Sequence, residues 1–218
     1  AYTSLDPSSL RVPCATTPTR DHHTMFTAVL GLFSQDLAID LGSSYTRVFL
    51  RGNGLVSEAP TVVSIHTART GARSVCAIGE EALPMIGRTP EDIEAIHPVR
   101  ESQIVNYEVA EAFLLHLVRQ LHGRNSMIRP RMIIPIPHNA SEMALRAVRD
   151  SCEFSGARSV ELVSRPIAGA LGAGLPIDEP TGSMVVDIGG GSTEVSVISM
   201  SDVVFSLTVP GGGTGMDE

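Results

Sequence analysis

Short apolar runs bounded by turn residues divide the chain into many strands, with a few segments of helical periodicity between them. The order is a strand hairpin, a mixed region, and a second hairpin of similar design, which predicts the α/β class. Strands are predicted at residues 36–40, 46–51, 61–66, 74–78, 93–97, 131–136, 160–163, 183–187, 193–199 and 203–209. Helices are predicted at 79–85, 107–121, 141–154 and 166–173.

Two of these helices carry the clearest signals. Apolar residues recur at helical spacing through 107–121, which predicts one buried stripe. Ser141 is a preferred N-cap residue, and Gly156 follows the end of the next helical segment at Phe154.

The two hairpins contain two versions of one motif, Asp40-Leu-Gly-Ser and Asp187-Ile-Gly-Gly-Gly-Ser. Each version is an apolar strand that ends near an aspartate, then a turn of small residues, then a second apolar strand. An internal repeat of this kind predicts two related halves whose turns converge.

Glycine and serine turns leave backbone N–H groups uncovered, and glycine also permits positive φ, so such turns bind phosphate oxygens. The carboxylates of Asp40 and Asp187 could hold Mg²⁺ through water. One such turn is usually only a tight hairpin, but two copies favour a site for a magnesium–nucleotide complex. Hydroxyl groups that could add donors belong to Ser43, Ser44, Ser192 and Thr193.

The amino-acid composition argues against several classes of function. The formal net charge is −8, which argues against nucleic acid as a partner. Every basic side chain is arginine, so no lysine is available to contact a phosphate. Cys14, Cys76 and Cys152 are widely separated, which fits a reducing cytoplasm and indicates no metal site. No apolar run reaches the length of roughly 18 residues that a membrane span requires.

The start of the chain is expected to lie outside the folded core. Residues 1–24 are rich in Thr, Ser, Pro and Arg and are predicted to be a disordered leader. Met25 to Phe33 is apolar with helical spacing. We favour docking of this segment on the core, and an amphipathic helix on the membrane surface is the alternative. The predicted location is therefore cytoplasmic, with membrane association left open.

Five stretches together resemble the MreB/Mbl family of bacterial rod-shape proteins, over about residues 25–218. They read LAIDLGSSYTRVFLRGNGLVSEAPTVVSI, AIGEEALPMIGRTPEDI, YEVAEAFL, SRPIAGALGAGLPIDEPTGSMVVDIGGGSTEVSVIS and GGGTGMDE. The resemblance implies the actin-like fold shared with sugar kinases and chaperone ATPases, with duplicated mixed sheets and flanking helices. It also implies ATP and Mg²⁺ as cofactors, and a filament under the membrane that positions cell-wall synthesis.

Carried over to this sequence, the resemblance implies specific site residues. Asp40 and Asp187 would hold Mg²⁺ through water, and Ser192 would orient the water that attacks the phosphate. The nucleotide-binding residues would be Gly42, Ser43, Ser44, Tyr45, Gly189, Gly190, Gly191, Ser192 and Thr193.

Three departures from the family pattern weaken the implied hydrolysis. Ala144 stands where the family carries the glutamate that aligns the water, a loss expected to slow hydrolysis by about 10²-fold. Ser164-Arg165-Pro166 replaces Glu-Glu-Pro, and Thr214-Gly215 replaces an acidic pair. At most a weak ATPase is therefore expected.

The resemblance also implies a division into lobes, with residues 25–140 as the first and 141–218 as the start of a second whose remainder is missing. Such an incomplete fold should expose apolar faces. The leading hypothesis is an MreB-like cytoskeletal protein that binds ATP and hydrolyses it poorly. The alternatives are a non-enzymatic module that modulates a full-length MreB filament, and a phosphatase of the same superfold, which only the motif DIGGGSTE suggests.

Overall fold

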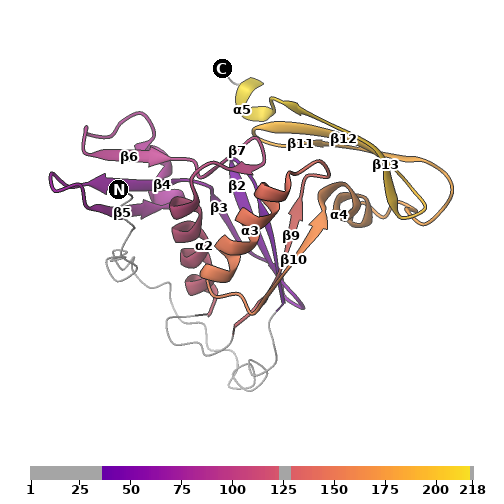
Figure 1. Cartoon of the computed structure of the whole chain (residues 1–218), viewed down its shortest axis with the longest axis horizontal. Coiled ribbons are helices and arrows are strands. Elements are labelled where there is room, and N and C mark those ends of the chain that lie inside the picture. The colour runs from indigo at the N-terminus through magenta and orange to yellow at the C-terminus, as the bar shows by residue number, and fades with distance from the viewer. Residues whose placement is uncertain (1–35, 123–128, 217–218) are drawn as a thin grey trace.

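The computed structural model describes residues 36–122 and 129–216 (Figure 1). The leader at 1–24 and the apolar segment at 25–33, for which we predicted disorder and docking, lie outside these residues. Among the described helices, none is long and apolar enough to cross a membrane.

The larger sheet has five strands in the order β10-β9-β1-β2-β3. Tight turns join β1, β2 and β3, so these strands run antiparallel, whereas β9 and β10 run parallel to β1 and are joined by the helix α3 (Glu142–Phe154). The sheet is therefore mixed. Its strands are β1 (Asp36–Leu41), β2 (Tyr45–Leu50), β3 (Gly54–Pro60), β9 (Arg131–Ile136) and β10 (Ser159–Ser164).

The main core lies between this sheet and the helices α2 (Tyr107–His122) and α3, which cover one face of it (Figure 1). Buried and half-buried positions alternate along β1, as expected for a strand with one face toward a core. Ser141 caps α3 as predicted, because its hydroxyl accepts a hydrogen bond from the amide of Ala144 at 3.2 Å. The largest fully buried side chains of this core include Leu37, Ile39, Phe113, Leu117, Met132 and Ile134.

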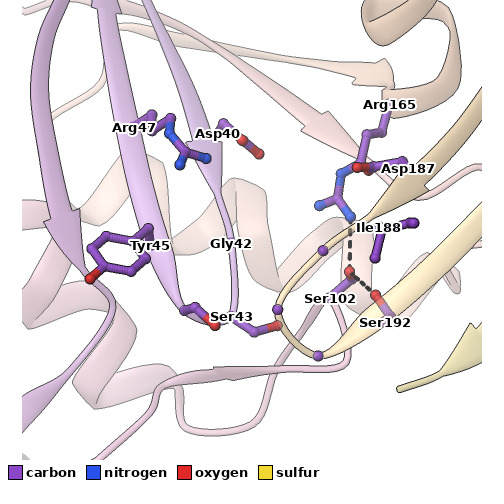
Figure 2. Close-up of a pocket in the computed structure, with 14 residues that line it drawn as sticks. Asp40, Gly42, Ser43, Tyr45, Arg47, Ser102, Arg165, Asp187, Ile188 and Ser192 are labelled. Carbon is purple, nitrogen blue, oxygen red and sulfur yellow. Dashed lines mark hydrogen bonds between the residues drawn. The ribbon is translucent and has the colours of Figure 1, made fainter. Parts of the chain in front are cut away.

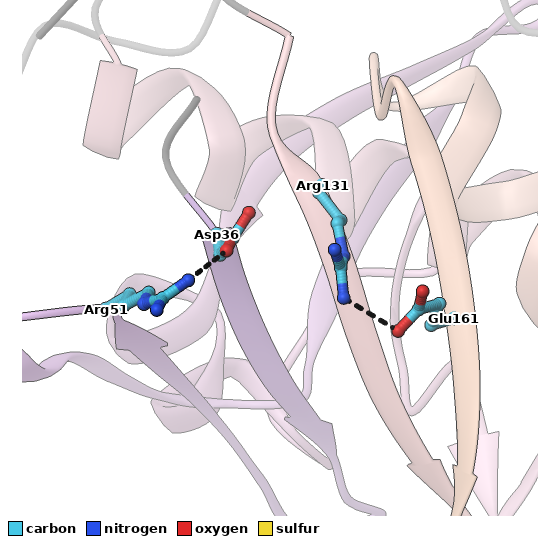
Figure 3. A network of polar contacts seen from close by, with 4 residues as sticks. All are labelled: Asp36, Arg51, Arg131 and Glu161. Carbon is cyan, nitrogen blue, oxygen red and sulfur yellow. Dashed lines mark hydrogen bonds and ion pairs between the residues drawn. The ribbon is translucent and has the colours of Figure 1, made fainter. Parts of the chain in front are cut away.

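Charged side chains connect the strands at the end of the sheet where β1 and β9 begin (Figure 3). Arg51 contacts Asp36 at 3.2 Å, and Arg131 contacts Glu161 at 3.0 Å. Asp36 and Arg131 are themselves neighbours across the two strands. Opposite charges therefore alternate across this end of the sheet, which favours the observed register.

The second sheet is a three-stranded antiparallel unit made of β11 (Ser183–Ile188), β12 (Ser192–Ser199) and β13 (Asp202–Pro210). The helix α4 (Arg165–Gly172) packs on one face through a small core that contains Ala170 and Ile198. The other face is apolar and exposed. Its exposed side chains are Met184, Val186, Ile188, Phe205, Leu207 and Val209.

Smaller elements complete the described chain. A three-stranded sheet, ordered β5-β4-β6, lies beside α2, and the two-stranded hairpin β7–β8 leads into that helix. The helix predicted at 79–85 forms as two 3₁₀ turns. These elements are β4 (Val63–Thr67), β5 (Arg73–Ile78), η2 (Gly79–Glu81), η3 (Leu83–Met85), β6 (Ile93–Ile96), β7 (Val99–Arg100), β8 (Gln103–Ile104) and α5 (Gly213–Met216).

The strand pairing differs from the division that we expected between residues 140 and 141. Residues 159–164 form β10, which pairs in parallel with β9 along its whole length, so α3 and β10 belong to the first sheet. The division between the two sheets therefore follows Ser164. A strand–helix–strand pattern in sequence has the same periodicity whether its strands share a sheet or not, so the sequence could not locate this boundary.

Candidate functional site

The hairpins β1–β2 and β11–β12 bend in the same way. Each bend has three residues, Gly42–Ser44 in the first and Gly189–Gly191 in the second. Asp40 and Asp187 each stand one residue before the end of the strand that enters the bend. The sequence repeat is therefore a structural repeat as well.

The two bends converge on one cavity of about 250 Å³ (Figure 2). The expected convergence is thus observed, and both aspartates lie on the cavity wall. All but one of the sequence-predicted site residues line this cavity, namely Asp40, Gly42, Ser43, Ser44, Tyr45, Asp187, Gly189, Gly190, Gly191 and Ser192.

Thr193 is the exception, because the strand geometry places its side chain away from the cavity wall. Successive side chains of a strand point to opposite faces, so Thr193 lies on the face of β12 opposite to Ser192. Its hydroxyl donates a hydrogen bond to the carbonyl of Gly211 at 3.0 Å.

Close approach explains the glycines of the second bend. A Cβ on Gly190 would collide with the side chain of Ser44, and one on Gly191 would lie 3.0 Å from the hydroxyl of Ser43. None of the three glycines at 189–191 has a positive φ. Glycine is therefore needed here for contact between the bends, and the conformational freedom invoked from the sequence is not used.

Backbone amides at both bends are available to an anion. Within residues 36–122 and 129–216, the amides of Ser43, Ser44, Gly190 and Gly191 donate to no acceptor. All four residues are half-buried on the cavity wall. Four such donors around one cavity are suited to oxygens of a phosphate group.

The two aspartates are too few to enclose a metal ion by themselves. In the described part of the chain, no cluster of three or more His, Cys, Asp or Glu residues could hold one. Mg²⁺ keeps several waters and commonly takes one or two carboxylates together with phosphate oxygens. Asp40 and Asp187 therefore fit a hydrated Mg²⁺ bound along with a polyphosphate.

Sequence reasoning missed three polar residues on the cavity wall: Arg47, Ser102 and Arg165. Arg47 contacts Glu58 at 2.8 Å. Arg165 begins α4 and donates from Nη1 to the hydroxyl of Ser102 at 2.8 Å (Figure 2). The departure from Glu-Glu-Pro had marked Arg165 as unusual, but no local pattern identifies Ser102.

Ser102 reaches the cavity because it occupies the turn of the β7–β8 hairpin. Its φ of 61° and the φ of 48° at Glu101 are left-handed. The hydroxyl of Ser102 lies 2.8 Å from that of Ser192. The predicted water-orienting hydroxyl of Ser192 is therefore on the cavity wall but already has one protein partner. Ala144 and the rest of α3 do not line the cavity.

The sequence of this chain is similar to proteins of a known family. A family model described as MreB/Mbl protein matches residues 34–218. Cell shape-determining protein MreB of Escherichia coli strain K12 is 47% identical over 191 residues, which cover 86% of this chain and 55% of that protein. The chain therefore spans about half the length of the curated relatives it matches.

Solved structures agree with the fold. The crystal structure of MreB5 of Spiroplasma citri bound to ADP has a TM-score of 0.75 and 27% identity, covering 84% of this chain and 54% of that one. The same protein bound to AMPPNP has a TM-score of 0.73 and 26% identity over the same shares. The predicted actin-like fold, present in part, is confirmed.

Proposed function

Because this chain belongs to the MreB/Mbl family, we propose that it serves a cytoskeletal role in determining cell shape and binds Mg·ATP between its two bends. The observation that carries the nucleotide proposal is the convergence of both bends and both aspartates on one cavity. The names of the relatives support the cell-shape role.

The chemistry of the cavity supports binding of the phosphate chain. The free amides of Ser43, Ser44, Gly190 and Gly191 would donate to phosphate oxygens. Bound Mg²⁺ would neutralise part of the phosphate charge, and Asp40 and Asp187 would hold its waters. At about 250 Å³ the cavity is smaller than the roughly 300–1,000 Å³ of pockets that enclose a drug-sized ligand, so it fits the phosphates rather than a whole nucleotide.

The same residues support slow hydrolysis at most. Ser192 would orient the attacking water, but its hydroxyl shares a hydrogen bond with Ser102. No carboxylate of α3 reaches the cavity wall, and Ala144 offers none. Binding, rather than turnover, is the activity that this site favours.

The proposed partners are further copies of this chain or a full-length MreB-type filament, in the cytoplasm. Contact of residues 25–33 with the membrane remains part of this proposal. A second candidate function is a non-enzymatic module that modulates such a filament. The exposed apolar face of β11–β13 supports it, because exposed apolar patches commonly mark protein contacts. Co-sedimentation with a full-length MreB filament tests it, and absence from the pellet at micromolar concentration would remove it.

Titration calorimetry with Mg·AMPPNP tests the nucleotide proposal. We expect saturable binding that weakens about tenfold or more in Asp40→Asn and Asp187→Asn, because each removes a carboxylate that holds the hydrated metal. Asp202→Asn, which changes an exposed aspartate remote from the cavity, should bind like the unaltered chain. Absence of saturable binding at millimolar ligand, or equal affinity in all three variants, would contradict the proposal.

A further inference from the structure

Among the residues that the structure describes, the cavity wall carries one guanidinium group that pairs with no carboxylate. Arg47 is engaged by Glu58, through contacts of 2.8 and 2.9 Å. Among the described residues, no carboxylate lies within ion-pairing distance of Arg165, and its buried Nε has no hydrogen-bond partner. Its contact with Ser102 uses only part of its capacity, because a guanidinium has five N–H donors. Arg165 therefore brings a positive charge and spare donors to the same cavity wall as Asp40 and Asp187.

The half-buried guanidinium group of Arg165 is suited to a ligand that carries negatively charged oxygens. A buried charge without a partner is unfavourable, and its planar fork matches phosphate oxygens in a bidentate way. The chain contains no lysine, so arginine is the only side chain with a permanent positive charge that could approach a phosphate here.

Ser102 orients this arginine. Its hydroxyl oxygen accepts from Arg165 Nη1 at 2.8 Å and lies 2.8 Å from the hydroxyl of Ser192. When Ser102 donates its own proton to Ser192, the proton of Ser192 is free for a ligand. In this arrangement Arg165 donates to Ser102, and Ser102 donates to Ser192. A serine at φ 61° is uncommon, and its contacts with both partners help to hold it there.

We propose that Arg165, oriented by Ser102, is a phosphate-binding residue that contacts the polyphosphate held between the two bends. This inference rests on the proposed function of the same cavity and adds to it two residues from outside the bends. Ser102 is a positioning residue, since it acts through Arg165 and Ser192.

The test uses the full chain and Mg·tripolyphosphate, which carries the phosphate chain without a base or sugar. Arg165→Gln should weaken binding about 10- to 100-fold, the range expected for a hydrogen bond to a charged group. Arg165→Lys keeps the charge without the planar guanidinium group, so its affinity should lie between those of the unaltered chain and Arg165→Gln. Arg158→Gln, which alters an exposed arginine away from the cavity, is the matched control and should leave the Kd unchanged.

Two further measurements separate phosphate contact from a structural role. The dependence of log Kd on log salt should be shallower in Arg165→Gln than in Arg158→Gln, because one cation fewer meets the anion. Ser102→Ala should weaken binding by about 3- to 10-fold while leaving that salt dependence intact. If Arg165→Gln does not fold, the comparison of Arg165→Lys with the unaltered chain decides, and equal affinity overturns the proposal.

The outcomes distinguish this inference from the proposed function. If the unaltered chain binds Mg·tripolyphosphate and Arg165→Gln binds equally well or better, Arg165 does not contact the phosphate chain, and this inference falls alone. If the unaltered chain binds neither Mg·tripolyphosphate nor Mg·AMPPNP, the proposed function fails and this inference falls with it.

Discussion

The contact between Gly190 and Ser44 is where the two bends approach each other closely. A Cβ added at Gly190 would overlap the hydroxyl of Ser44 and lie 2.9 Å from its Cβ, closer than side-chain carbons approach. The hydroxyl of Ser44 is also 3.1 Å from that of Thr214. Gly190→Ala therefore pushes the second bend away from the first and strains this contact.

The size of the effect follows from two opposing terms. Forcing an extra methyl group into a packed contact costs about 1–3 kcal/mol. Replacing glycine by alanine restricts the unfolded chain and returns about 0.4–1 kcal/mol, because the φ of Gly190 is not positive. We therefore expect Gly190→Ala to lower the free energy of unfolding by about 1–2 kcal/mol.

Unfolding in urea measures this change in the free energy of unfolding for Gly190→Ala and for two further variants, Gly172→Ala and Ser44→Gly. Gly172→Ala is the control, because an added Cβ meets nothing within 4 Å there, and it should be neutral or slightly stabilising at the end of α4. Ser44→Gly removes the side chain that Gly190→Ala would strike. The double variant should therefore be more stable than the sum of the single effects predicts, by about 1–2 kcal/mol.

A Gly190→Ala variant as stable as the unaltered chain would refute the collision between the two bends. That collision is also refuted if the cost of Gly190→Ala is the same with and without the side chain of Ser44, because the collision would then not be its source.

Two other predictions concern buried polar groups. Glu194, 4% exposed, accepts from the amide of His138 and the hydroxyl of Ser206, both at 3.0 Å. Glu194→Ala should therefore lower the free energy of unfolding, measured in urea, by about 1.5–3 kcal/mol. Glu161→Ala, at the exposed ion pair of Figure 3, is the control and should lower it by less than about 1 kcal/mol. Equal losses in the two variants would contradict this prediction. Burial raises the pKa of Cys152 from 9.0 to about 12, so unfolded chains ionise first and stability should fall as pH rises from about 9 towards 12. Cys152→Ala should lessen that slope by up to about 1.4 kcal/mol per pH unit in urea titrations at successive pH values, and an unchanged slope would count against it.

Local patterns were enough to locate most elements. The strand at 131–136 has the predicted bounds, and the next helix has the predicted N-cap and ends at Phe154 as expected, because apolar periodicity and an N-cap serine act over a few neighbouring residues. The strand β3 (Gly54–Pro60) was missed, since its exposed and half-buried residues do not alternate in a readable way. The two-residue strands β7 and β8 are too short to produce any period.

The repeat of an aspartate followed by a small-residue bend could be read from the sequence, because one hairpin contains each copy and the strand fixes where its aspartate stands. The tertiary structure alone decided what surrounds these bends. The side chain of Thr193 was placed away from the cavity by the face of β12 on which it lies, and β10 was assigned to the first sheet by pairing with β9. Arg165 and Ser102 reached the cavity from elements far from either bend in sequence. Such contacts depend on how separate elements pack, which no periodicity within one element encodes.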